Sequence, residues 1–162
     1  MSHTPPPPAE LDSFDRKILE ILSGEARISM TELATRVGLS KTPVLARVKR
    51  LEKDGIITGY RAQLSAARLG LDHVAFIELK LSDTREAALT AFNDAVRRLP
   101  EVEECHMIAG GFDYLIKVRT RDIRDYRRVL GDGISRLPHV ASSSTYVAME
   151  AVKDRDVSDW DA

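Results

Sequence analysis

Positive charge is concentrated in one short segment of this 162-residue chain, residues 40–53, although the formal net charge of the whole chain is −1. Five basic side chains in the segment face a single carboxylate, that of Glu52. They are Lys41, Arg47, Lys49, Arg50 and Lys53. Cations grouped in this way can bind the phosphates of a nucleic acid, because the position of the charge matters more than the total. Nucleic-acid binding is therefore the first chemistry that the sequence indicates.

A helix over residues 40–53 would have one apolar side and one basic side. With about 100° between successive residues, Val44, Val48 and Leu51 fall together and should pack on the rest of the domain. The opposite side mixes basic and small side chains, which lets the backbone approach a major groove closely. We predict these contacts to double-stranded DNA: Ser40, Lys41, Thr42, Pro43, Ala46, Arg47, Lys49, Arg50 and Lys53.

The basic residues of this segment should differ in what they contact. The arginine fork suits bidentate hydrogen bonds, so we expect Arg47 and Arg50 at base edges or deep phosphates. We expect Lys41, Lys49 and Lys53 to contact phosphates. A charged face alone would also fit the solvated surface of a domain that binds protein.

A second candidate site is the loop Ala109–Tyr114, which joins two predicted strands. Gly110 and Gly111 suit a tight connection and leave backbone N–H groups open to a carboxylate. The carboxylate of Asp113 could hold an ammonium group, so the loop offers partners for both ends of a free amino acid. The chemistry alone equally fits a plain hairpin turn in which Asp113 caps its own backbone.

Other chemistry finds little support in the sequence. The single cysteine, Cys105, excludes an intrachain disulfide, and the four histidines show no metal-ligand spacing. A Ser/His/Asp order, a glycine-rich phosphate loop and a pair of acid/base carboxylates are all absent, so we expect no enzyme, catalytic residue, metal or cofactor. There is no apolar run of membrane-spanning length, and Pro5–Pro8 stand where a signal peptide would have its apolar core. We therefore expect a cytoplasmic protein without membrane contact.

Helix-start signals divide the first 55 residues into three predicted helices. Asp12 precedes the first helix, with Asp15 three residues further on, and Ser29 precedes the second, with Glu32 at the capping-box position. Ser40 precedes the third, which should end near residues 54–55.

The connections between these helices indicate a winged helix-turn-helix domain. Gly38 should end the second helix in the left-handed conformation, and Leu39 should reach the core, so that only a short turn separates helices two and three. We expect a two-stranded wing to follow, with strands at residues 56–60 and 61–64.

The second half of the chain contains an internal repeat. Leu99-Pro100-Glu101-Val102 returns as Leu137-Pro138-His139-Val140, each time closing a predicted helix and opening a strand. Two strand-helix-strand units follow from this pattern: 74–81, 84–99 and 102–109, then 114–119, 123–137 and 140–152. They predict an α+β, ferredoxin-like βαββαβ domain with both helices on one face of the sheet. The uncovered face would suit a homodimer.

These patterns predict the following division of the chain. Residues 1–10 would be a disordered N-terminus, 11–64 the winged helix-turn-helix domain, 65–72 a linker, 73–152 an effector-binding and oligomerisation domain, and 153–162 an acidic tail. Trp160 in that tail has no evident role.

Several of these motifs together resemble the leucine-responsive regulator (Lrp/AsnC) family, over residues 11 to 153. The resemblance is carried by Leu11-Asp12-x-x-Asp15-x-x-Ile18-Leu19, by Gly38-Leu39-Ser40, by Gly110–Tyr114 and by Thr145-Tyr146-Val147. It implies a winged helix-turn-helix joined to an effector-binding (RAM) domain, dimers that associate into tetramers or octamers, and an amino acid as effector.

The resemblance also implies an effector site at the 109–114 loop, between neighbouring dimers, with Ser143 and Thr145 lining it from the last strand. Residues 41–43, 80–86 and 103–110 look like the activators of proline dehydrogenase within the family, although Val44 stands where that branch would have cysteine. Proline is then the expected effector, with Met107 or Phe112 packing on its ring. The complete predicted set is Met107, Gly110, Gly111, Phe112, Asp113, Tyr114, Ser143 and Thr145.

The sequence thus predicts a regulator that binds a pseudo-palindromic operator as paired dimers and responds to an amino acid. One alternative is an architectural, nucleoid-type DNA-binding protein with little effector response. Another is the regulatory subunit of an amino-acid enzyme that does not bind DNA, against which the basic helix argues.

Overall fold

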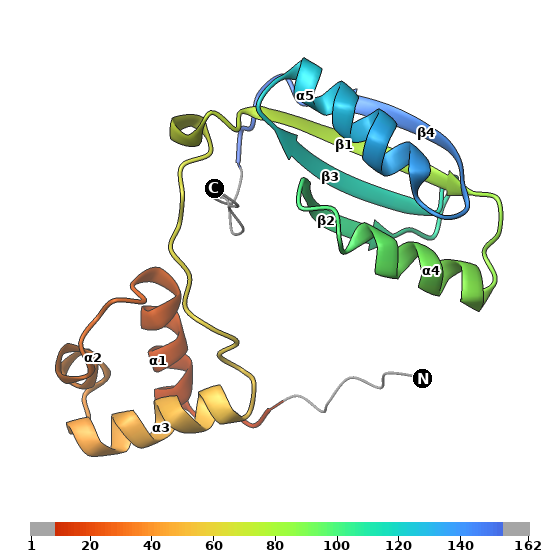
Figure 1. Ribbon diagram of the computed structural model, residues 1–162. Coiled ribbons are helices and arrows are strands. Elements are labelled where there is room, and N and C mark those ends of the chain that lie inside the picture. Colours follow the sequence, from red (N-terminus) through yellow and green to blue (C-terminus); the bar gives the residue numbers. More distant parts are fainter. Residues whose placement is uncertain (1–8, 154–162) are drawn as a thin grey trace. The chain divides into compact units, whose positions relative to one another are not determined.

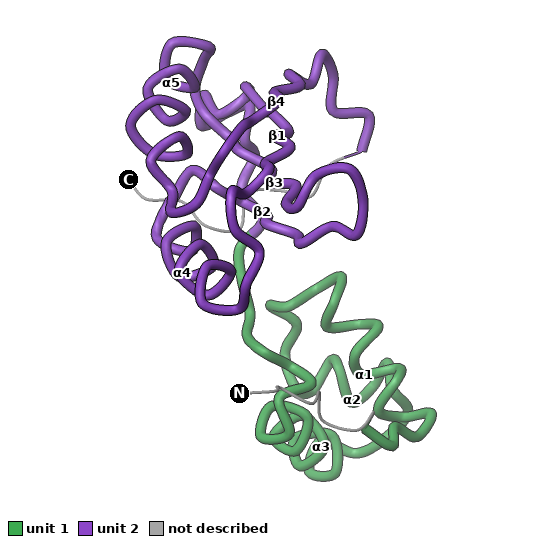
Figure 2. Tube along the Cα trace, turned by 90° about the vertical axis from the view of Figure 1, so that its right-hand side faces the viewer, with its two compact units in different colours: residues 1–62 green, residues 63–162 purple. Residues whose placement is uncertain are grey.

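The computed structural model describes residues 9–153 and divides into two compact units, residues 1–62 and 63–162 (Figure 2). Most of the predicted disordered N-terminus (1–10) and of the predicted acidic tail (153–162), Trp160 included, lies outside the described residues. Nowhere between residues 9 and 153 is a helix both long enough and apolar enough to cross a membrane.

Unit 1 is built from α1 (Ser13–Gly24), α2 (Met30–Val37) and α3 (Lys41–Lys53). α1 begins with a complete capping box, in which Asp12 and Asp15 each accept the other's backbone N–H. The box predicted for α2 is only half formed. Ser29 accepts the N–H of Glu32, but the Glu32 carboxylate pairs with Arg36 one turn later.

The turn between α2 and α3 is short, as predicted. Gly38 adopts φ 85°, and its N–H donates to the carbonyl of Ala34. Leu39, the next residue, packs against the unit 1 core. That core is formed by Ile18, Leu22, Ile28, Leu33, Ala34, Val37, Val44, Val48 and Leu51. The turn thus fixes α3 across the other two helices with one side buried.

The two predicted strands of the wing are not formed within residues 56–64, where Leu64 makes one isolated bridge. The N–H groups of Ile56 and Ile57 donate to the carbonyl of Leu51, at 2.9 and 3.0 Å, and both side chains pack on the unit 1 core. This stretch therefore finishes α3 and cannot use those N–H groups for strand pairing.

Unit 2 is an antiparallel sheet with two helices over one of its faces (Figure 1). Its strands are β1 (His73–Leu81), β2 (Val102–Met107), β3 (Tyr114–Thr120) and β4 (Val140–Val147), in the order β2-β3-β1-β4. The predicted βαββαβ topology is confirmed. β2 and β4 end before the predicted 109 and 152.

The helices of unit 2 are α4 (Glu86–Val96) and α5 (Ile123–Arg128), with a short 3-10 helix at Ala67–Leu69 before the sheet. The predicted helix 123–137 does not stay α-helical. It continues as a π-helix at Val129–Gly133 and a 3-10 turn at Ile134–Arg136. Two glycines in the π-helical stretch, which are poor helix formers, account for the loss of regularity.

The two faces of the sheet differ as the alternation in β1 predicts. Ala75, Ile77, Leu79 and Leu81 are buried beneath the helices, in a core that Phe92 of α4 completes. The even-numbered residues of β1 lie on the opposite face, which neither helix covers (Figure 1). This uncovered side is called the open face below.

Candidate DNA and effector sites

The α3 helix buries one side and presents the other to solvent, as its sequence predicts. Val44, Val48 and Leu51 are at most 4% exposed. The other side carries the predicted DNA-contacting residues, of which Arg47 alone is half-buried. The exposed ones are Ser40, Lys41, Thr42, Pro43, Ala46, Lys49, Arg50 and Lys53.

Arg47 and Arg50 are held by carboxylates of α1. Arg47 donates to Asp12 at 2.7 Å and to Asp15 at 2.8 Å, and Arg50 donates to the other oxygen of Asp15. Asp15 is only 1% exposed, and a buried carboxylate is stable as an ion only with cations or hydrogen-bond donors beside it. Both guanidiniums join α3 to α1, so contact with base edges would require them to leave the Asp15 carboxylate, and that role stays a prediction.

The electrostatics of this cluster favour the ionised state. Burial alone would raise the pKa of Asp15, but hydrogen bonds from Arg47 and Arg50 outweigh it, so that the pKa lies below its usual 3.8. The pKa of Asp12 is lowered by the backbone N–H of Asp15 and by Arg47. The carboxylates thus neutralise part of the positive charge that the sequence concentrates on α3.

The lysines of α3 behave differently from its arginines. Lys41, Lys49 and Lys53 are exposed and form no hydrogen bond or ion pair with any residue in the described range 9–153. Their ammonium groups are available to an external anion. These three lysines can therefore bind DNA phosphates without breaking an interaction within the described residues.

In unit 2, the loop before β3 is fastened to the sheet through Asp113. One Asp113 carboxylate oxygen accepts the N–H of Leu81 at 2.7 Å, and the Asp113 N–H donates to Leu79 at 2.9 Å. The pairing of β1 with β3 ends at Leu79 opposite Tyr114, so the Leu81 N–H lies beyond the last partner on that side and needs another acceptor. We expected the Asp113 carboxylate to hold an ammonium group. One of its two oxygens is instead occupied by the backbone N–H of Leu81.

A hollow of about 250 Å³ lies beside this loop, lined by Glu78, Lys80, Gly111, Phe112, Ser142 and Ser144. Only Gly111 and Phe112 belong to the predicted effector set. Tyr114 is 2% exposed and packs on Phe92, while Met107 is 60% exposed outside the hollow. Gly110 and Asp113 belong to the same loop but do not line it.

Ser143 and Thr145 lie on the opposite side of β4 from the hollow. They pair with Leu79 and Ile77, so they share the helix-covered side, and Thr145 hydrogen-bonds Tyr126 of α5 at 2.6 Å. A shift of one residue along a strand exchanges the two faces. Their neighbours Ser142 and Ser144 are therefore the residues that line the hollow.

The hollow combines opposite charges on one strand. Glu78 and Lys80 are two residues apart in β1 and both lie on the open face, with the Tyr146 hydroxyl donating to Glu78 at 3.4 Å. An ammonium beside Glu78 and a carboxylate beside Lys80 would both find a charged partner. Buried and more exposed residues alternate along β1 from Ala75 to Leu81, and the more exposed positions include Glu78 and Lys80. The sequence alone could therefore have indicated both as candidate site residues. Among residues 9–153, no group of three potential ligands could hold a metal.

Comparisons with known proteins agree with this architecture. A family profile described as winged helix-turn-helix DNA-binding matches residues 11–58, and one described as the Lrp/AsnC ligand binding domain matches residues 74–158. The chain belongs to the Lrp/AsnC family of transcriptional regulators. The family resemblance and fold class predicted from the sequence are thereby confirmed, as is the expectation of a regulator and not an enzyme.

Lrp/AsnC relatives match nearly the whole chain. The proline dehydrogenase transcriptional activator of Rhodobacter capsulatus is 60% identical over 146 residues, which cover 90% of this chain and 95% of that protein. The leucine-responsive regulatory protein of Escherichia coli (strain K12) is 46% identical over 147 residues, covering 91% and 90%.

Solved Lrp/AsnC structures share the fold. An AsnC family regulator from Agrobacterium tumefaciens has a TM-score of 0.85 at 31% identity, covering 90% of this chain and 94% of that one. A transcriptional regulator of Neisseria meningitidis, solved as a complex with L-methionine, has a TM-score of 0.83 at 32% identity, with the same coverage.

Proposed function

We propose that this regulator senses proline at the hollow beside the 110–113 loop and controls transcription of proline dehydrogenase. The observation that carries the proposal is that Glu78 and Lys80, with opposite charges, both line a hollow of about 250 Å³. The two relatives from Rhodobacter capsulatus and Rhizobium radiobacter, at 60% and 61% identity, are both named proline dehydrogenase transcriptional activators.

The chemistry of the hollow suits proline. The proline carboxylate would accept from Lys80, and its secondary ammonium has two N–H groups, for Glu78 and a serine hydroxyl of β4. The ring of Phe112 supplies the apolar wall for the short proline ring. Gly110 and Asp113, which belong to the same loop, would act by shaping it from outside the hollow.

In the same proposal, α3 enters the major groove of the operator. Lys41, Lys49 and Lys53 bind phosphates, while the small residues Thr42 and Ala46 let the helix lie close to the bases. Ser40 and Pro43 lie in the first turn, where recognition helices commonly contact DNA. Two copies of α3 would read half-sites about 34–36 Å apart.

Self-association through the open face completes this proposal. Phe76 and Tyr146 are 37% and 54% exposed on that face, so pairing with a second copy would remove apolar surface from water. The hollow opens on the same face. A bound amino acid would thus lie at or beside the contact and could bias assembly if it binds two assemblies unequally.

Isothermal titration of the full chain with proline, leucine, methionine and asparagine tests the effector. We expect the strongest binding with proline, and at least tenfold weaker proline binding in E78Q and in K80Q. S142A should weaken binding, whereas the matched control S143A, on the other side of β4, should not. Heat from none of the amino acids would favour the architectural alternative, and equal effects of S142A and S143A would contradict the hollow as the site.

A further inference from the structure

The start of α5 carries a dense group of arginines in unit 2. Between residues 119 and 128 the chain has five arginines and two aspartates. Arg119 differs from the other four because it is 7% exposed and pairs with Glu103. The remaining arginines are all exposed: Arg121 precedes the N-cap of α5, Arg124 lies in its first turn, and Arg127 and Arg128 lie in its last turn.

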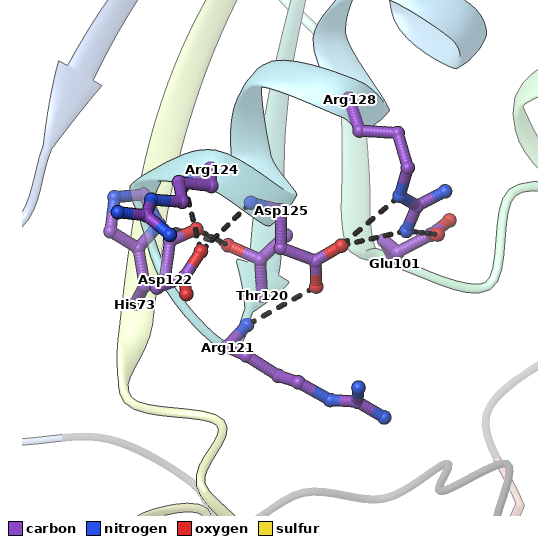
Figure 3. Close-up of polar contacts among 8 residues, drawn as sticks. All are labelled: His73, Glu101, Thr120, Arg121, Asp122, Arg124, Asp125 and Arg128. Carbon is purple, nitrogen blue, oxygen red and sulfur yellow. Dashed lines mark hydrogen bonds and ion pairs between the residues drawn. The ribbon is translucent and has the colours of Figure 1, made fainter.

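The carboxylates near this turn are already engaged (Figure 3). Asp122 is the N-cap of α5, and its carboxylate accepts the N–H groups of Arg124 and Asp125, each at 2.8 Å. Asp125 pairs with Arg128 at 2.8 Å, and Glu101 pairs with the same guanidinium at 3.3 Å. Asp122 thus binds the helix backbone, and Asp125 and Glu101 both bind Arg128.

The other three guanidiniums form no hydrogen bond or ion pair with these carboxylates, although the pKa of Asp125 is lowered by its hydrogen bond to Arg128 and also by the charge of Arg121. Arg121, Arg124 and Arg127 are exposed, and their side chains form no hydrogen bond or ion pair with any residue between 9 and 153. In Figure 3 the side chain of Arg121 extends away from the carboxylates of the cluster. Arg124 and Arg127 are three residues apart, so they follow each other along one side of the helix at a rise of about 4.5 Å.

We propose that Arg121, Arg124 and Arg127, here called the α5 arginine set, bind phosphates of duplex DNA outside the half-sites read by α3. The guanidinium matches a phosphate in charge and in hydrogen-bond geometry. The protein already carries a DNA-binding domain, so DNA held by α3 is present at high effective concentration for a second contact. The contact has no base specificity, because phosphates carry no sequence information.

The proposal rests on DNA binding by α3, and the test separates the two. Full-length protein is titrated with a short duplex, holding one pair of half-sites selected in vitro by the wild type, and with the same site inside a duplex of about 150 base pairs, one persistence length. The variant is R121Q/R124Q/R127Q. The matched control is R85Q/R97Q/R136Q, which removes the same charge from exposed arginines already paired with Asp83, Asp94 and Asp132.

We expect the variant to bind the short duplex as the wild type does and the long duplex about tenfold more weakly than the control. The slope of log affinity against log salt on the long duplex should fall by roughly 2–3, since each phosphate contact contributes about 0.9.

Three outcomes would overturn the proposal. If variant and control bind the long duplex with equal affinity and equal salt dependence, the α5 arginine set is not a second DNA-binding surface. The function assigned to α3 would be unaffected by that result. A changed sedimentation mass of the variant without DNA would make the α5 arginine set a protein–protein contact instead. If the in vitro selection yields no duplex that the wild type binds, both the proposal and the function assigned to α3 fail.

Discussion

The carboxylate of Asp15 and the guanidinium of Arg47 lie 2.8 Å apart and join the first turn of α1 to the middle of α3. Because Asp15 is 1% exposed and also binds Arg50, this single carboxylate orients two cations of the recognition helix. The orientation of α3 against α1 therefore depends on a charge cluster as well as on the apolar core.

Replacing Asp15 by Asn should destabilise the protein by about 1–3 kcal/mol, because two guanidiniums lose their buried partner. The expected cost lies below that of a fully buried ion pair, since Arg47 is 26% and Arg50 48% exposed. Urea unfolding followed by circular dichroism measures the change. Glu20→Gln, an exposed carboxylate on the same helix, is the control, and an equal effect of the two substitutions would contradict a structural role for Asp15.

The same cluster predicts a dependence of stability on pH. The pKa of Asp15 is lowered in the folded chain through its hydrogen bonds to Arg47 and Arg50, which outweigh the effect of burial. The unfolded chain therefore binds protons more readily, so the stabilisation is present above the usual pKa of 3.8 and is lost as the pH falls through the lower folded pKa. The unfolding free energies of wild type and D15N should differ at pH 7, and the difference should shrink as the pH falls below 3.8. A constant difference across that range would sink this assignment.

Substitutions of Lys49 and of Arg47 should have different effects, because we expect Lys49 to bind DNA and Arg47 to stabilise the fold. Lys49→Gln is expected to leave unfolding unchanged, to weaken binding to all duplexes about equally and to lower the salt slope by about 1, as for the loss of a phosphate contact. Arg47→Ala is expected to reduce stability first, because Arg47 binds both Asp12 and Asp15. Fluorescence anisotropy at several salt concentrations, beside urea unfolding, distinguishes the two. A K49Q variant with wild-type affinity would place the DNA elsewhere.

Asp113 offers a test of structural against ligand-binding roles. Asp113→Ala should destabilise the protein by about 1–3 kcal/mol, since the Leu81 N–H loses its acceptor, whereas the amide oxygen of Asp113→Asn can replace it. If Asp113 also holds the effector ammonium, D113N should keep its stability but lose proline affinity. Unfolding and calorimetry of both variants give the answer, and equal stability of D113A and wild type would show that the Leu81 bond contributes nothing.

Sequence features within one turn of helix or one strand were enough to predict most helices and strands. Asp12 and Ser29 cap α1 and α2 through their side chains, and α3 starts after Ser40 as predicted, although the Ser40 side chain makes no capping hydrogen bond. Gly38 ends α2 with the positive φ that a glycine tolerates. The alternation in β1 correctly assigned Ala75, Ile77, Leu79 and Leu81 to the core. These features depend on neighbours within one turn or one strand, so the sequence alone determines them, together with the basic character of α3.

The tertiary structure decided which of these charged and polar groups remain available. Arg47 and Arg50 face Asp15 across 32 and 35 residues of chain, and no periodicity within α3 reveals a partner on another helix. The β1–β4 register placed Ser142 and Ser144, not Ser143 and Thr145, at the hollow, because one residue along a strand reverses the direction of a side chain. Pairings between distant segments are set by how the elements pack, and that information lies in the fold as a whole.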